Sequence, residues 1–195
     1  MPQNLDSVVS GESTVAEAAD PLHATALLYH NEFPWSDLDA IEGLLGVFRA
    51  NRVIGAALGR YLESLGLGLS RARYTVLRTL YFASGKRMPQ NEIGREMGVS
   101  RTNITNLVDG LEKDRLVVRM TNPSDRRVTY AQLTPEGEAL CQSMMPAMTR
   151  FMEDVLSDLS ADEKAVLREL MSRIWRTVES RYRGGECASD AEPRE

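Results

Sequence analysis

The pattern of polar and apolar residues predicts long helices at both ends of the chain, around a shorter central module. Apolar residues recur at helical spacing between residues 36 and 66, which predicts one long helix there. After the central module, apolar stripes predict a helix capped by Thr134 and a final helix that begins with Ser160 and Glu163, a Ser-x-x-Glu capping box. These flanking helices have more apolar surface than one small lobe needs, so we expect two copies of the chain to associate through them.

The central module, residues 90–133, combines two short helices with two strands. The first helix ends at Gly98, a residue that tolerates the left-handed conformation in which helices commonly end. Ser100 can cap the second helix, whose apolar residues at steps of three and four predict one buried face: Ile104, Leu107, Val108 and Leu111. Strands are predicted to begin at Leu116 and Val128, with turn-forming residues between them. We expect a mainly α-helical fold with a small two- or three-stranded antiparallel sheet.

The start of the second helix is polar and unlike that of an ordinary core helix. A helix-turn-helix followed by a two-stranded wing is an arrangement in which one helix enters the major groove of DNA and the wing tip reaches the minor groove. Arginine and asparagine can make paired hydrogen bonds to guanine and adenine edges, whereas serine and threonine mostly bind phosphates. The predicted major-groove residues are Ser100, Arg101, Thr102, Asn103, Thr105 and Asn106, and the predicted wing contacts are Asp125, Arg126 and Arg127.

This module resembles the MarR (multiple antibiotic resistance regulator) family of bacterial winged-helix regulators. The resemblance extends over roughly residues 36–183, but only the central part carries distinctive motifs. Arg115 departs from the pattern, because the family often has glycine there and glycine adopts a positive φ without strain. The matching motifs are Gly98-Val99-Ser100-Arg101, Asn106-Leu107-Val108-Asp109-Gly110-Leu111-Glu112, Asp125-Arg126-Arg127 and Leu133-Thr134-Pro135-Glu136-Gly137.

The resemblance implies a homodimer whose two winged-helix lobes bind the halves of a near-palindromic operator in double-stranded DNA. It further implies a repressor that a small aromatic or anionic ligand releases from DNA. The ligand pocket would lie along the first long helix and the helix after it, where arginines can bind a carboxylate or phosphate and aromatic rings can stack. The candidate pocket residues are Phe48, Arg49, Arg52, Tyr61, Arg73, Tyr74, Leu77 and Tyr81. For each of them, core packing or plain surface exposure is the competing interpretation.

Charge is distributed unevenly along the chain. The net charge is −5, yet residues 70–133 contain 12 Lys or Arg and 6 Asp or Glu, a local charge of +6. The remaining residues contain 11 Lys or Arg against 22 Asp or Glu, a charge of −11. Salt screens electrostatic fields beyond about 8–10 Å, so the positive charge of the central module matters more for DNA binding than the net charge of the whole chain.

The sequence lacks the marks of several other classes of protein. No common catalytic or nucleotide-binding motif occurs, so we expect neither an enzyme nor a cofactor. The two histidines, His23 and His30, have no cysteine partners, and we expect no metal site. Cys141 and Cys187 are far apart, there is no secretory signal, and no apolar run is long enough to span a membrane, which favours the cytoplasm.

We expect five segments along the chain. They are a disordered acidic tail (1–20), an N-terminal segment with the first dimerisation helix (21–66), the DNA-binding lobe (67–133), the C-terminal dimerisation helices (134–183) and a disordered tail (184–195). A winged-helix module that binds protein rather than DNA is the alternative, as is a regulator that needs no ligand or responds to oxidation through Cys141. The sequence does not distinguish a repressor from an activator.

Overall fold

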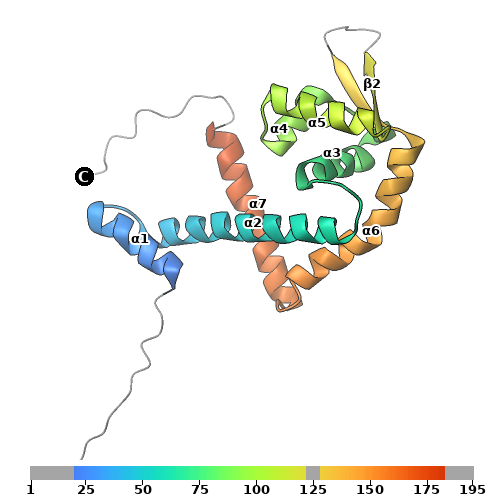
Figure 1. The fold of residues 1–195 in the computed structure, drawn as a ribbon. Coiled ribbons are helices and arrows are strands. Elements are labelled where there is room, and N and C mark those ends of the chain that lie inside the picture. The colour runs from blue at the N-terminus through green and yellow to red at the C-terminus, as the bar shows by residue number, and fades with distance from the viewer. Residues whose placement is uncertain (1–19, 122–127, 183–195) are drawn as a thin grey trace, which may run out of the picture. The chain divides into compact units, whose positions relative to one another are not determined.

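The computed structural model describes residues 20–121 and 128–182, and these residues form a mainly helical protein with one small antiparallel sheet (Figure 1). The expected fold class is confirmed. The predicted tails and the tip of the wing lie outside the described residues, apart from residue 20. In chain order the elements are α1 (Pro21–Glu32), α2 (Leu38–Ser64), α3 (Arg71–Phe82), the 3-10 turn η1 (Ser84–Lys86), β1 (Arg87–Pro89), α4 (Gln90–Met97), α5 (Arg101–Lys113), β2 (Val117–Thr121), β3 (Thr129–Leu133), α6 (Pro135–Val155) and α7 (Ala161–Tyr182).

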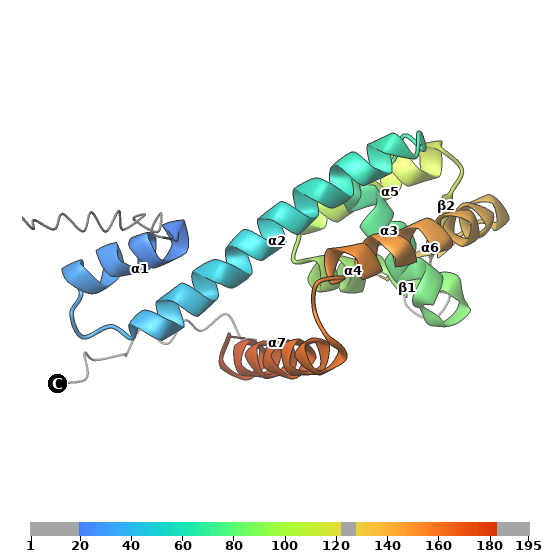
Figure 2. The same cartoon turned by 90° about the horizontal axis from the view of Figure 1, so that it is seen from below.

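The chain divides into two compact units, residues 1–57 and residues 58–195. In the first unit, α1 lies beside the first half of α2 (Figure 2). His23 Nδ1 is 3.1 Å from a carboxylate oxygen of Glu42, Arg49 lies 3.8 Å from Asp20, and Ala26 is fully buried. The polar contacts therefore flank a small apolar contact.

The core of the second unit is built from α3, α4, α5, the sheet and the adjoining parts of α2 and α6. Ser70 caps α3, since its hydroxyl accepts a hydrogen bond from the Arg73 amide. Tyr61 of α2 stacks on Phe151 of α6 with ring centroids 5.2 Å apart, and it donates a hydrogen bond to the Ala147 carbonyl. These contacts attach the end of α2 to the middle of α6, and α6 continues as a helix through its internal proline.

The sheet has three strands in the order β1-β3-β2. Val117 of β2 pairs with Leu133 of β3, and Arg119 pairs with Ala131. The expected sheet allowed for a third strand, but the position of this strand, β1, was not predicted, because it is only three residues long and ends in Pro89. Proline has no amide hydrogen to donate and is tolerated at sheet edges, which is where β1 lies.

Two backbone features shape the path from α5 through the wing to α6. Arg115 accepts the left-handed conformation at φ +59°, where the family often has glycine. Its carbonyl then receives a hydrogen bond from the Thr134 hydroxyl, which also caps α6 by accepting from the Gly137 amide. The backbone of Gly137 lies so close to the Leu116 carbonyl that a Cβ at this position would clash with it.

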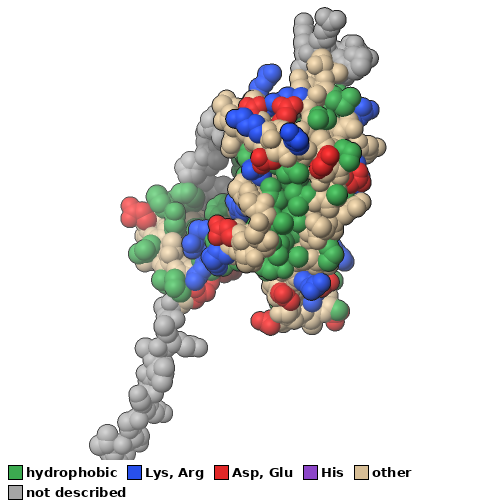
Figure 3. Space-filling model, turned by 45° about the vertical axis from the view of Figure 1, so that its right-hand side comes forward, with side chains coloured by type: hydrophobic (Ala, Val, Ile, Leu, Met, Phe, Trp, Pro, Cys, Tyr) green, Lys and Arg blue, Asp and Glu red, His purple; other side chains and the backbone are tan. Residues whose placement is uncertain are grey.

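Apolar side chains remain exposed on several helices. They gather in the middle of the face drawn in Figure 3, with charged side chains around them.

Helix α7 begins with the predicted capping box: Glu163 accepts a hydrogen bond from the Ser160 amide, and this bond holds the pKa of Glu163 below its usual value. The exposed apolar residues of α7 are Val166, Leu170, Met171, Ile174, Trp175, Val178 and Tyr182.

No helix within residues 20–121 and 128–182 is long and apolar enough to cross a membrane.

Candidate nucleic-acid interface

Helix α5 presents the polar edge that the sequence predicted. Its apolar face is buried through Ile104, Val108 and Leu111. Helix α4 ends at Gly98 in the left-handed conformation (φ +64°), and the short turn after it leads directly into α5. The polar residues at the start of α5 are all exposed to solvent: Ser100, Arg101, Thr102, Asn103, Thr105 and Asn106.

Two of these hydroxyl groups also serve the helix itself. Ser100 accepts a hydrogen bond from the Asn103 amide at 3.3 Å and is therefore the N-cap of α5. Thr105 donates to the Arg101 carbonyl at 2.9 Å, one turn earlier. Arg101, Thr102, Asn103 and Asn106 carry the remaining donors and acceptors on this edge, and they are exposed side chains of the first two turns.

Arg73 attaches the far end of α5 to α3. Its guanidinium donates to the Gly110 carbonyl at 3.1 Å and forms an ion pair with Asp114. Because Gly110 has no side chain, the guanidinium lies against its backbone. This arginine, predicted as a candidate ligand contact, is thus used within the described structure to hold α5.

Arg119 connects the wing to α5. From strand β2 its Nη1 atom lies 2.7 Å from Glu112 Oε2 and 2.5 Å from Asp109 Oδ1, while Nη2 donates to the Thr105 carbonyl at 3.1 Å. Glu112 also accepts a hydrogen bond from the Arg119 amide. Hydrogen bonds between ionised groups are stronger than neutral ones, so these contacts hold β2 firmly against the middle of the helix.

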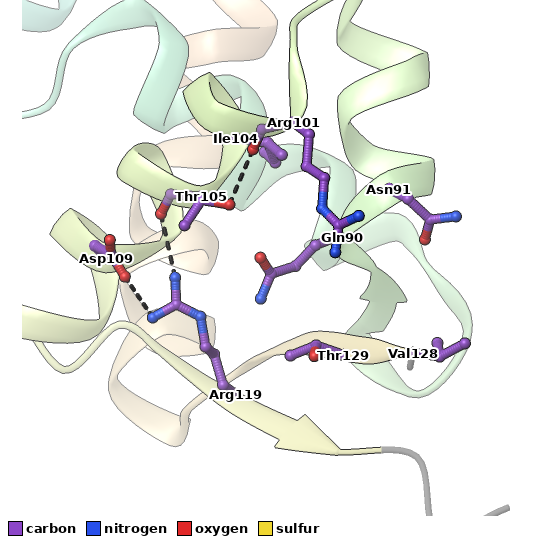
Figure 4. Close-up of a pocket in the computed structure, with 9 residues that line it drawn as sticks. All are labelled: Gln90, Asn91, Arg101, Ile104, Thr105, Asp109, Arg119, Val128 and Thr129. Atoms are coloured by element: carbon purple, nitrogen blue, oxygen red, sulfur yellow. Dashed lines mark hydrogen bonds and ion pairs between the residues drawn. The ribbon is translucent and has the colours of Figure 1, made fainter. Parts of the chain in front are cut away.

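A cleft of about 510 Å³ opens between α4, α5 and the wing (Figure 4). In Figure 4, Gln90 points into this cleft, Arg101 extends from α5 toward Gln90, and Asn91 points away from the centre. Arg119 forms the opposite wall and directs its guanidinium at α5. The lining residues are Gln90, Asn91, Arg101, Ile104, Thr105, Asp109, Arg119, Val128 and Thr129.

Four residues of this surface were not predicted from the sequence: Gln90, Asn91, Arg119 and Thr129. Gln90 and Asn91 start the first helix of the helix-turn-helix, and that position was the available signal. For Arg119 the signal was a strand arginine that follows two acidic residues, Asp109 and Glu112, on one face of a helix. Asp125, Arg126 and Arg127, the predicted wing contacts, lie outside the described residues.

The eight candidate ligand residues divide between the two units. Phe48, Arg49 and Arg52 belong to the first unit, where a groove of about 490 Å³ is lined by these three residues together with Pro21, Leu22 and Thr25. The other five belong to the second unit: Tyr61, Arg73, Tyr74, Leu77 and Tyr81.

Most of the second-unit candidates have partners there. Leu77 is fully buried, and burial raises the pKa of the nearly inaccessible Tyr74. Tyr61 stacks on Phe151, and Tyr81 contacts Phe82 edge to face and lies under the Lys86 ammonium. Core packing, the competing interpretation, therefore describes these aromatic side chains in the described structure.

Cys141 is fully buried on α6, with its thiol 3.8 Å from the Leu77 carbonyl. Burial, the largest influence, raises the pKa of this thiol to about 11, against a smaller lowering effect of Lys86. The thiolate is the reactive form of cysteine, so this environment disfavours oxidation.

Comparison with known protein families gives a match to the MarR family over residues 67–128. Among individual proteins, the chain is similar to the helix-turn-helix transcriptional regulator MhqR of Bacillus subtilis. The two are 31% identical over 126 residues, which is 65% of this chain and 84% of MhqR.

Two solved structures are similar in fold. A mutant of MarR from Escherichia coli complexed with operator DNA has a TM-score of 0.61 at 24% identity, and the match covers 75% of this chain and 97% of that one. The regulator BpsR of Bordetella bronchiseptica, whose DNA binding is regulated by 6-hydroxynicotinic acid, has a TM-score of 0.59 at 21% identity, with coverage of 68% and 96%. At these identities the likeness establishes the winged-helix fold alone.

Proposed function

Because the chain belongs to the MarR family of DNA-binding transcriptional regulators, we propose that it is a dimeric repressor that a small aromatic or anionic ligand releases from its operator. One observation carries the proposal. The first two turns of α5 expose a polar edge while the opposite face of the helix is buried and its far end is held by Arg73. Such a helix is presented rigidly, and a rigid polar edge suits the reading of base edges.

We assign the groove contacts as follows. Arg101, Asn103 and Asn106 read base edges, each paired contact contributing about 1–3 kcal/mol of discrimination. Thr102 and Thr105 bind phosphate or thymine methyl groups, and Ser100 divides its hydroxyl between the helix cap and a phosphate. The wing residues Asp125, Arg126 and Arg127 extend the contact to the minor groove, with one arginine inserted there.

Dimerisation is proposed because a single recognition helix covers only half of a near-palindromic site. Two copies place their helices about 34 Å apart, one turn of DNA. The apolar residues of α7 are exposed, and more lie exposed on α1, on α2 and in the turn between them, including Leu28, Ile54 and Trp35. Monomeric proteins rarely expose so many large apolar residues, so a second copy is the partner that we propose for them.

Release by a ligand is proposed from the groove that contains Phe48, Arg49 and Arg52. Arg49 is only loosely paired with Asp20, at a distance of 3.8 Å between the guanidinium and the carboxylate. Phe48 and Arg52, which line the groove beside it, are exposed to solvent. Two arginines beside an aromatic ring suit an aromatic carboxylate, and 6-hydroxynicotinic acid, which regulates BpsR, belongs to that class. A ligand that prefers a dimer with different spacing of the recognition helices would weaken operator binding.

The test is binding of the purified protein to the DNA upstream of its own coding region, compared with a scrambled duplex at several salt concentrations. We expect tight, salt-sensitive binding with at least a hundredfold preference for the upstream DNA, because specific complexes exceed non-specific ones by about 10³ or more. Aromatic carboxylic acids are then added to the complex, and at least one is expected to release the protein.

Loss of release in an Arg49→Ala, Arg52→Ala double variant, with DNA affinity unchanged, would place the ligand in the groove. If neither the upstream DNA nor duplexes selected from random sequence are preferred over scrambled DNA, the operator-reading role is wrong.

A further inference from the structure

The cleft beside α5 contains a polar group without a partner. The Nε2 atom of Gln90 is buried and has no hydrogen-bond acceptor within the described part of the chain. A buried donor left unpaired costs about 1–3 kcal/mol, so a group of this kind is expected to find a partner in water or in a bound molecule. In Figure 4 the amide points into the cleft rather than into the protein core.

The charges around the cleft indicate which kind of partner fits. Arg119 is committed to Asp109, Glu112 and the Thr105 carbonyl. Arg101 lines the same cleft, and no ion pair joins it to any acidic residue that the structure describes. An amide donor beside an arginine without an acidic partner favours an anionic acceptor such as a phosphate oxygen.

The start of α4 adds to this preference. Pro89, at the N-cap position, makes no side-chain hydrogen bond to the helix, so no cap competes for the first amide groups. Helix starts carry a partial positive charge. In a helix-turn-helix the first helix crosses the DNA backbone while the second lies in the groove. Gln90 is the first residue of α4, and it therefore lies on the side that the backbone crosses.

We propose that Gln90 donates its side-chain amide to a phosphate of the DNA strand that passes over the start of α4, and thereby sets the register of α5 in the major groove. The inference rests on the proposed role of α5 in DNA reading. The long side chain turns the amide toward the phosphate by rotation about its terminal bonds, with no movement of the backbone. The contact is neutral and independent of sequence, and it aligns the base-reading residues without reading a base itself.

Three variants of the full-length protein test the contact: Gln90→Glu, Gln90→Ala and, as a matched control, Gln142→Ala. Gln142 is an exposed glutamine on α6 and is not among the residues that line the cleft. Dissociation constants are measured by fluorescence anisotropy at several KCl concentrations. The probes are a duplex selected from random-sequence DNA by the wild-type protein and a scrambled duplex of the same composition.

For Gln90→Ala we expect about a tenfold loss of affinity for both duplexes, with the slope of log Kd against log salt unchanged. A neutral donor displaces no counterion, whereas each lost charged contact changes that slope by about 0.9. For Gln90→Glu we expect a larger loss, because a carboxylate would face the phosphate. Its melting temperature should be unchanged or raised, since an acidic residue in the first turn of a helix is favourable. Gln142→Ala should bind as the wild type does.

Binding of both Gln90 variants with wild-type affinity would overturn the proposal. A loss confined to the selected duplex would also overturn it, because every duplex offers a phosphate and loss of a phosphate contact must weaken binding to the scrambled duplex as well. If the wild-type protein shows no preference for the selected duplex, the operator-reading proposal fails separately, and binding to the scrambled duplex still decides whether Gln90 contacts a phosphate.

Discussion

At the scale of single residues, the chain approaches itself closely between the start of α6 and the segment that joins α5 to β2. Gly137 presses its backbone against the Leu116 carbonyl, and no other residue type fits there without movement of the chain. Thr134 ties the same junction together by bonding both to Arg115 and to Gly137. The base of the wing is therefore held by close backbone contacts, and these contacts are possible because Gly137 has no side chain.

Gly137→Ala should lower the free energy of unfolding by about 2 kcal/mol or more, because the added methyl group forces the backbone of α6 away from Leu116. Gly59→Ala is the matched control, since nothing lies within 4 Å of the position that its Cβ would occupy. It should stabilise the helix by about 0.5–1 kcal/mol. Chemical denaturation of the two variants measures both effects. Equal stability of both would contradict the close contact.

The buried thiol of Cys141 leads to a second prediction at this scale. A thiol with a pKa of about 11 is about a hundredfold less ionised at pH 8 than one with the ordinary value of 9.0. Alkylation of Cys141 by iodoacetamide should therefore be slower in the native protein than in denaturant by at least that factor, and mass spectrometry of the peptide containing Cys141 measures the rate. Rapid native labelling would restore the oxidation-responsive alternative.

At the scale of elements, the recognition helix is held from two sides. Arg73 holds its far end from α3, and Arg119 holds its middle from the wing strand β2. Both arginines bond to backbone carbonyls as well as to carboxylates. The contacts of Arg73 and Arg119 therefore have two effects. They fix the orientation of α5, and they neutralise acidic side chains beside the predicted DNA surface.

Arg119→Met should lower stability by about 1–2 kcal/mol, a modest loss because both carboxylates remain partly exposed to water. The variant should also weaken DNA binding, because Asp109 and Glu112 would then repel phosphates. This loss of affinity should be larger at low salt than at high salt, because salt screens the repulsion. Addition of Asp109→Asn to the variant tests this reason. If DNA affinity does not recover in the double variant, the lost contact acts through the position of the wing and not through charge.

At the scale of the whole molecule, several helices expose large apolar side chains to solvent, and α7 exposes a row of them. Every residue of α7 is at least partly exposed, although the helix carries a row of large apolar residues. A helix of this kind is stable when its apolar face is covered by another chain. The proposed dimer supplies that cover.

Ile174→Lys should weaken self-association by about two orders of magnitude or more, because the symmetry of a dimer buries the unpaired charge twice. Sedimentation velocity over a range of protein concentrations measures the change, and operator binding should fall with it. Arg173→Ala, an exposed polar neighbour on α7, serves as the control and should remain dimeric. A wild-type protein that sediments as a monomer would remove the dimer from the proposed function.

The features that depend on a few neighbouring residues follow from the sequence alone. Helical periodicity predicted the principal helices, capping chemistry located Ser100, Thr134 and Ser160, and the polar edge of α5 is visible in the sequence alone. Such signals are local, because a helix cap or an amphipathic repeat is decided within one or two turns.

Which distant residues meet depends on how the elements pack together. The pairing of Arg87 with Gln132, the bonds from Arg119 to α5 and the cleft around Gln90 join residues that local spacing does not connect. The same holds for Gly137, whose need to be glycine comes from the Leu116 carbonyl and not from its own helix. Contacts between separate elements follow from how buried faces pack together, and a pattern along the chain does not contain that information.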